Sequence, residues 1–294
     1  MEQGRYMRNV KRKKRGRKLL ATAAFLVTVL SVAAVICLAM FFNIEQLLLA
    51  GATRYSTEQL IAASGVVKGQ NIFAVSTKKA AATLYQSFPY LDQVKVKRLL
   101  PTTIQIIVEE TSAAVAVVNS SKSYTLLGAN DRVLEHISDV STEGVPIVLG
   151  ADLSQIAPGT KVNRQTLDNL YNAVGDDETL RPQLERMNAA LSKLTTARAM
   201  LLVAQQLAFE DISYFDVSDE LAVSLLYDNR VLVLLGSELQ LDYKMKFAQK
   251  VIGELGDSFI GSIDLSTAAN NQRSYSREQN IETLMNPVYF EGYY

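Results

Sequence analysis

The sequence predicts an α+β protein: one membrane-spanning helix, then a unit of β-α-α-β-β order, then a mixed unit built on a mainly antiparallel sheet. Three observations lead to this prediction. Residues 19–44 contain no charged side chain. After them, runs that alternate apolar and polar residues predict strands, and stretches with 3–4 spacing predict helices. The 294 residues, 48% hydrophobic and 20% charged, are enough for two folded units.

The net charge of zero hides two oppositely charged parts. Residues 1–18 form a basic tail with nine Lys or Arg and one acid, whereas the rest of the chain has 21 basic and 29 acidic groups. A mostly acidic body argues against a nucleic-acid-binding domain, which needs basic groups to neutralise phosphates. A nucleic-acid-binding role for the tail alone stays an alternative.

Residues 19–42 are predicted to form a transmembrane helix, because about 20 apolar helical residues cross a bilayer. The flanking run KRKKRGRK at 11–18 places the N-terminus in the cytoplasm and residues 43–294 outside. A cleaved signal peptide is the alternative. Its apolar part would be shorter, about 7–15 residues, and would end at small residues rather than at Phe41 and Phe42. A lipoprotein modified at Cys37 is disfavoured by the bulky Ile36 before it.

The first outer unit is predicted over residues 43–112. Residues 44–50 indicate a strand. Ser56 and Gln59 have the spacing of a capping box, which predicts a helix over 57–64.

A second helix is predicted over 77–87, followed by two strands over 91–99 and 102–110 with alternating apolar residues. We expect Phe73 and Val96 to be buried between the helices and the sheet. The resulting order is β-α-α-β-β.

The segments YSTEQLIAASGVVKGQNIFAV and VKVKRLLPTTIQIIVEE resemble the POTRA domain of the FtsQ/DivIB family of bacterial cell-division proteins. The succession of basic tail, one span and POTRA domain is also that of the family. The sequence departs from the family pattern at Thr111, where Arg is usual, and at Ala113, where Pro is usual. The matching positions are Gly51, Ser56, Gly65, Gly69, Asn71, Ile72, Phe73, Pro89, Val94, Val96, Arg98, Pro101, Ile106, Val108 and Glu110.

The second outer unit is predicted over residues 113–272 and resembles the family's β-domain. The likeness lies in VSLLYDNRVLVLLG, YKMKFAQKVIGEL and GSIDLS. Helices predicted near 164–208 are longer than is usual there, and they either pack on the sheet or present a coiled-coil surface. The predicted elements are strands at 113–118, 124–137 (with a turn), 145–153, 212–236 (a meander with an Asp228-Asn229 turn) and 262–266, and helices at 164–174, 178–208 and 241–255.

A tail at residues 273–294 is predicted to be loosely ordered. Its last six residues include four aromatics. This end is either a docking peptide or an aromatic terminus without function.

No motif for catalysis is present: there is no P-loop, GxSxG or HExxH. One Cys and one His, Cys37 and His136, exclude a disulfide framework, a Cys-rich zinc site and a His-pair metal site. We therefore expect no enzyme activity, no cofactor, no metal, no small-molecule substrate and no nucleic-acid partner.

The resemblance implies a non-enzymatic divisome scaffold in the cell membrane at the division septum, which helps to control septal cell-wall synthesis. The implied partners are FtsL-like and FtsB/DivIC-like coiled-coil proteins. The alternative is a POTRA-bearing chaperone or transport component of the envelope. Such proteins usually carry tandem POTRA domains and a barrel of about ten-residue strands, and neither pattern is found here.

The resemblance also implies a partner site in the C-terminal part of the β-domain, where a partner adds a strand to a sheet edge. We expect the strand at 262–266 to be that edge, with the helix at 241–255 beside it. The alternative is that this strand pairs internally and the tail covers it. The predicted partner-binding residues are Ser262, Ile263, Asp264, Leu265, Ser266, Thr267 and Tyr275.

Overall fold

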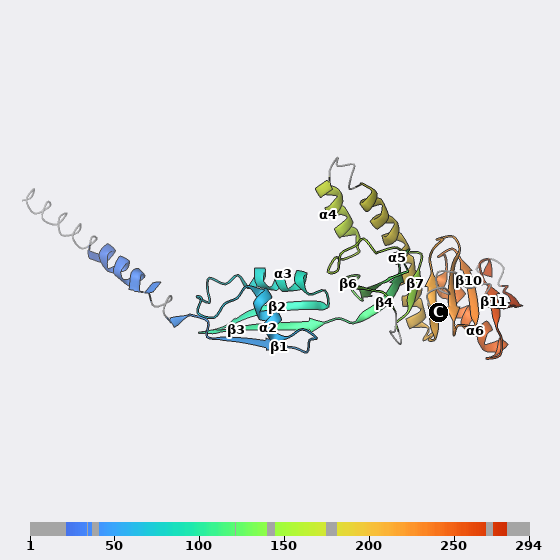
Figure 1. Cartoon of the computed structure of the whole chain (residues 1–294), viewed down its shortest axis with the longest axis horizontal. Helices are drawn as coiled ribbons and strands as arrows, with labels where there is room; N and C mark the ends of the chain where they lie inside the picture. The colour runs from blue at the N-terminus through green and yellow to red at the C-terminus, as the bar shows by residue number, and fades with distance from the viewer. Residues whose placement is uncertain are drawn as a thin grey trace, which may run out of the picture. The chain divides into compact units, whose positions relative to one another are not determined.

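The structure is a computed structural model, and its chain divides into two compact units (Figure 1). Unit 1 comprises Met1–Tyr85 and Gln93–Glu109, and unit 2 comprises Gln86–Asp92 and Glu110–Tyr294. The residues that the structure describes are 22–33, 35–36, 41–120, 122–139, 145–174, 181–268 and 273–280.

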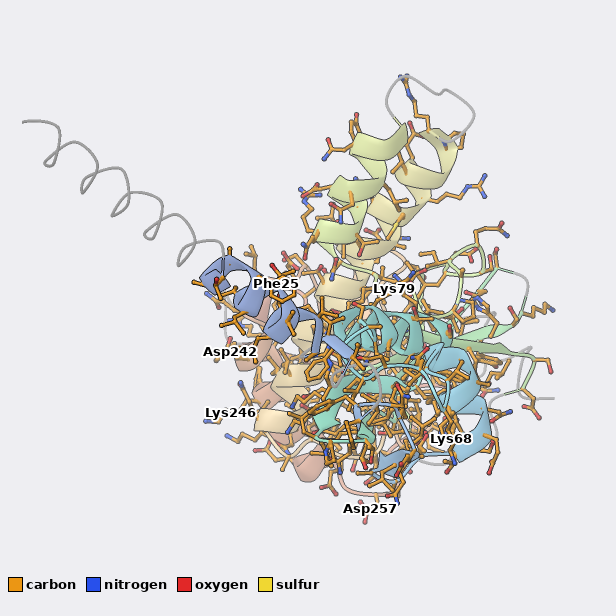
Figure 2. All side chains as sticks on the ribbon, turned by 90° about the vertical axis from the view of Figure 1, so that its left-hand side faces the viewer. Phe25, Lys68, Lys79, Asp242, Lys246 and Asp257 are labelled. Carbon is orange, nitrogen blue, oxygen red and sulfur yellow. The ribbon has the colours of Figure 1, made fainter. Side chains whose placement is uncertain are left out.

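The described residues 22–33, 35 and 36 are helical, with exposed apolar side chains such as Phe25 (Figure 2). In the part of the chain that the structure describes, no helix is long and apolar enough to cross a bilayer. The predicted basic tail and parts of the predicted span lie outside the described residues.

Unit 1 has a three-stranded sheet of order β1-β3-β2, in which β1 runs parallel to β3. Two helices come between β1 and β2 in the chain, so the predicted β-α-α-β-β order is confirmed (Figure 1). The elements are β1 (Gln46–Ala50), α2 (Thr57–Ser64), α3 (Thr77–Ser87), β2 (Leu91–Leu99) and β3 (Thr103–Glu110).

The predicted capping box of α2 is present. The Gln59 N–H donates to Ser56 Oγ at 3.2 Å, and the Ser56 N–H donates to Gln59 Oε1 at 3.0 Å. At the other end, Gly65 takes the left-handed conformation, with φ of 67°. These local signals explain why the predicted bounds of α2 agree with the structure.

The core of unit 1 is formed by apolar side chains from both helices, the sheet and the turn before α3. Leu60, Ile72, Leu84, Ile104 and Ile106 have no exposed surface.

The prediction that Phe73 is buried was wrong. Its side chain is 48% exposed, and its ring contacts the Phe42 ring with centroids 5.2 Å apart. The Phe73 N–H donates to Asn71 Oδ1 at 2.9 Å, which fixes a turn. Ile72 fills the core instead. Val96, also expected in the core, is half-buried.

Unit 2 contains a nine-stranded sheet of order β12-β11-β10-β9-β8-β7-β4-β5-β6 (Figure 1). Five neighbouring pairs are antiparallel and three are parallel, so the sheet is mainly antiparallel as predicted. The strands are β4 (Ala113–Val118), β5 (Tyr124–Gly128), β6 (Val133–Ile137), β7 (Ile147–Leu149), β8 (Ile212–Asp216), β9 (Val223–Tyr227), β10 (Val231–Gly236), β11 (Gly261–Asp264) and β12 (Tyr275–Glu278).

Three helices accompany this sheet: α4 (Arg164–Val174), α5 (Arg181–Gln206) and α6 (Leu241–Leu255). One face of α5 and one face of α6 belong to the same buried cluster as the sheet residues, so these two helices pack on the sheet. The first turns of α5 lie beside α4 and form a smaller cluster with it (Figure 1).

Arg198, which interrupts the apolar stripe of α5, has a local role. Its guanidinium forms an ion pair with Asp131 and donates to the Ala129 carbonyl oxygen at 2.9 Å. Burial raises the pKa of the Asp131 carboxyl, and the adjacent Arg198 charge opposes that increase. Arg198 therefore ties α5 to the turn between β5 and β6.

Candidate partner-binding edge

The candidate site is the end of the unit 2 sheet formed by β10, β11 and β12. β11 runs parallel to β10 and antiparallel to β12, with Ile263 opposite Ser276 and Asp264 opposite Tyr275. All four residues of β12 are exposed. Within the described residues no strand pairs with the outer side of β12, so β12 is the edge.

The orientation of the β12 backbone follows from one hydrogen bond. The Gln279 N–H donates to the Ile260 carbonyl oxygen at 3.3 Å, which continues the β11–β12 register. Because successive N–H groups of a strand point to opposite sides, the N–H groups of Ser276 and Glu278 point away from β11. In the described part of the chain, no strand pairs on the side to which these two donors point, which is the side where a strand could be added.

The seven predicted site residues differ in how far they are exposed to solvent. Ile263 and Leu265 have no exposed surface, Ser262 is buried and Asp264 is half-buried. The other three are exposed: Ser266, Thr267 and Tyr275.

The expectation that the strand at 262–266 forms the sheet edge was wrong, because β12, which belongs to the predicted tail at 273–294, pairs with its outer side. The alternative, that this strand pairs internally and the tail covers it, is confirmed for residues 275–278. Tyr275 is the one predicted site residue that lies on the edge strand. A partner-binding role for the seven residues stays a prediction.

Three residues that were not predicted complete β12: Ser276, Arg277 and Glu278. Their segment, YSRE, has no apolar alternation because it is exposed on both faces. One signal was available: Gly261 opens β11, and a Cβ at this position would collide with the Arg277 carbonyl oxygen. A glycine before a strand therefore indicated that another backbone approaches closely.

Side chains at both ends of β11 hold the edge in place. Gln279 Nε2 donates to Ser262 Oγ at 2.8 Å. After β11, the Ser266 N–H donates to Asp264 Oδ1 at 2.9 Å, and the Leu265 N–H donates to the Leu234 carbonyl oxygen at 2.8 Å.

Arg230 connects the β9–β10 turn to the segment that enters β11. Its guanidinium donates to Asp228 Oδ2 at 2.8 Å and to the carbonyl oxygens of Gly256 at 3.2 Å and Phe259 at 3.0 Å. It also lies 5.3 Å from the centre of the Tyr227 ring. The start of β11 is thus fixed by one largely buried cation.

Helix α6 carries the chain from β10 to β11. It presents Asp242 and Lys246 to solvent (Figure 2), whereas Lys244 is buried. The Lys244 ammonium donates to the Ser237 carbonyl oxygen at 2.8 Å, and burial lowers the pKa of this amine.

Across the described ranges no group of three His, Cys, Asp or Glu residues is placed to hold a metal ion. His136 lies on β6, where Nδ1 is 2.9 Å from Thr125 Oγ1 and Nε2 is 3.0 Å from the Ile156 carbonyl oxygen. The histidine thus belongs to a hydrogen-bond network between β5, β6 and the loop after β7.

Known proteins resemble this chain at its POTRA region and, at lower identity, over most of its length. The family model described as "POTRA domain, FtsQ-type" matches residues 42–111. The cell division protein DivIB of Clostridium botulinum (strain Hall) is 23% identical over 90% of this chain and 93% of its own length. Residues 42–111 thus match an FtsQ-type POTRA domain, and the chain is similar over most of its length to a DivIB cell division protein.

Two further relatives match shorter parts. DivIB of Clostridium acetobutylicum is 30% identical over 42% of this chain, and the cell division protein FtsQ of Corynebacterium glutamicum is 32% identical over 37%. The chain spans about half the length of these two relatives, 48% and 40%. The FtsQ-type match covers the elements from β1 to β3, and the candidate edge lies outside it.

Proposed function

We propose that this chain acts in cell division as a non-enzymatic scaffold of the divisome. The observation that carries the proposal is the FtsQ-type POTRA match within a chain that aligns over 90% of its length with a DivIB protein. Residues 19–42 anchor the protein in the membrane, and residues 43–294 lie outside the cytoplasm. The charge-free stretch and its basic flank support this topology.

In this proposal the edge strand β12 receives a strand from an FtsL-like or FtsB/DivIC-like partner. Backbone hydrogen bonds supply the affinity, and the exposed side chains of Tyr275, Arg277 and Glu278 supply the selectivity. Binding there helps to control septal cell-wall synthesis. The exposed donors of Ser276 and Glu278 support strand addition at this place.

Imaging tests the division role. A fluorescent protein is fused to the cytoplasmic N-terminus of the full chain, and dividing cells are observed. We expect a ring at mid-cell. The same fusion in cells blocked in division before ring assembly is the control, and it should give no ring. A uniform envelope signal in dividing cells would instead favour the transport component and would contradict the scaffold.

A further inference from the structure

Two loops of unit 1 are hydrogen-bonded to residues 42–46, at the end of the charge-free stretch. The first loop is 66–73, which lies between α2 and α3. Three backbone hydrogen bonds join it to this segment: Gly69 N–H to the Ile44 oxygen at 2.8 Å, Ile44 N–H to the Gln70 oxygen at 2.9 Å, and Ile72 N–H to the Phe42 oxygen at 2.8 Å.

The second loop is the turn between β2 and β3. The N–H groups of Glu45 and Gln46 both donate to the Thr102 carbonyl oxygen, at 2.8 and 3.3 Å. Arg98, near the end of β2, connects this strand to the first loop and the residues after it, because its guanidinium donates to the carbonyl oxygens of Ile72 at 3.0 Å and Val75 at 2.6 Å. Both loops are therefore fixed at the end of unit 1 where β1 begins (Figure 1).

Exposed apolar side chains occur on these two loops and at the adjoining end of β2. Among the residues 42–85 and 93–109, five large hydrophobic side chains are exposed, and four of them lie in these three places. Leu48, in the middle of β1, is the fifth. We call the four residues the rim: Val67 (62% exposed), Phe73 (48%), Leu99 (42%) and Leu100 (59%).

Exposed apolar patches mark contacts with a partner or a membrane, whereas single exposed apolar residues are common on soluble domains. The hydrogen bonds above tie the rim loops to residues 42–46, which are the last residue of the predicted span and the four residues after it. The four residues that follow the span, 43–46, can extend at most about 14 Å from its end. The headgroup region on each side of a bilayer is roughly 5–8 Å thick. The rim is thus within reach of that region. Its composition also fits, since segments that lie at the bilayer surface bury Phe and Leu side chains there and the exposed Lys68 (Figure 2) suits anionic phosphates.

We propose that the rim is a membrane-contact site: Val67, Phe73, Leu99 and Leu100 enter the headgroup region of the outer leaflet, and Lys68 contacts lipid phosphate. The occupant is the phospholipid bilayer. This inference rests on the proposed membrane anchor and adds to it a second contact that fixes the POTRA domain on the bilayer surface.

The chain has no Trp, so one introduced Trp is a site-specific reporter. Full-length Val67→Trp and Leu100→Trp proteins are placed in vesicles of phosphatidylethanolamine and phosphatidylglycerol, with either ordinary or brominated acyl chains. Phe25→Trp, in the apolar stretch, reports on the anchor. Leu48→Trp is the matched control, because it is an exposed apolar residue of unit 1 outside the rim.

We expect emission at positions 67 and 100 to shift to shorter wavelength and to be quenched by brominated lipid, whereas emission at position 48 keeps its wavelength and intensity. If position 25 is quenched and the rim positions match position 48, the anchor stands and the membrane-contact site is refuted. If position 25 is not quenched either, the anchor itself fails. If the emission of the rim positions shifts only when a division protein is added, and not with lipid, the site binds that protein and the proposal is overturned. Circular dichroism of each variant checks that it is folded.

Discussion

Ile72 and Phe73 are adjacent in the chain, but only Ile72 is buried. We expect Ile72→Ala to lower the free energy of unfolding of unit 1 by about 2–5 kcal/mol, because it leaves a cavity between helices and sheet. Phe73→Ala should cost clearly less, since its ring has solvent on one side. Denaturant unfolding followed by circular dichroism measures both. Equal losses for the two variants would contradict the assignment of the core.

Lys244 makes stability depend on pH. Burial lowers the pKa of its amine from 10.5, so between the lowered pKa and 10.5 the unfolded chain binds more protons than the folded chain. The free energy of unfolding therefore gains a contribution as pH rises through this interval. Lys244→Met removes it. We expect the wild type to become more stable relative to this variant as pH increases towards 10.5. A difference that stays constant with pH would show that the amine is not perturbed.

Asn119 illustrates a buried polar contact. Its Oδ1 accepts the Leu153 N–H at 3.0 Å, and its Nδ2 donates to Ser123 Oγ and Thr125 Oγ1, both at 3.0 Å. Asn119→Ala leaves the buried Leu153 N–H without its acceptor, at a cost of about 1–3 kcal/mol. Asn119→Asp retains an acceptor and should lose less at neutral pH. Thermal unfolding of the two variants in parallel tests this order.

At the scale of elements, the edge strand β12 gives the sharpest test of partner binding. Ser276→Pro removes an N–H that points away from β11, so the internal pairing is kept while the outer donor is lost. We expect this variant to fold and to bind an FtsB/DivIC-like partner several-fold more weakly in a pull-down with the full chain. Ser276→Ala keeps the donor and is the matched control.

Normal binding by a folded Ser276→Pro chain would place the partner surface elsewhere. Arg277→Pro removes a donor on the β11 side and should reduce stability as well as binding. The contrast between positions 276 and 277 therefore separates loss of the outer donor from loss of the strand.

Elements with local signals could be predicted from the sequence, and elements fixed by distant contacts could not. α6 was predicted with its bounds because its buried residues Met245, Ala248, Val251 and Ile252 recur at helical spacing. The β9–β10 hairpin was predicted from Asp228-Asn229, and both residues have φ of 49°, as such a tight turn requires.

β12 was not predicted because its residues are polar and show no strand pattern. It forms a strand only because the chain turns back after β11 and pairs with it. The predicted edge was therefore β11, one strand inside the edge that the structure shows. For Phe73, the sequence predicted a buried side chain, whereas the structure buries the adjacent Ile72 instead. That choice depends on the hydrogen bonds of Asn71 and Ile72.

At the scale of the whole molecule, the proposed topology places the basic tail on the cytoplasmic side of the membrane and the acidic units on the other side. The tail at 1–18 carries a balance of +8 and the rest of the chain −8. Lys and Arg next to a span stay in the cytoplasm, so the acidic units are expected outside. Protease added to intact spheroplasts should digest residues 43–294 and leave a small membrane-protected N-terminal fragment.

The positive charges before the span should determine the orientation of the protein in the membrane. Replacing the six Lys and Arg at positions 12–15, 17 and 18 by Asn or Gln removes most of the orientation signal. We expect part of that protein to become resistant to external protease, because some chains then insert in the opposite direction. A matched variant with the six substitutions made among exposed cations of the outer units, such as Lys95 and Lys246, keeps the flank intact and should be digested like the wild type. Full protection of the unaltered chain in spheroplasts, with digestion after lysis, would place both units in the cytoplasm and overturn the topology.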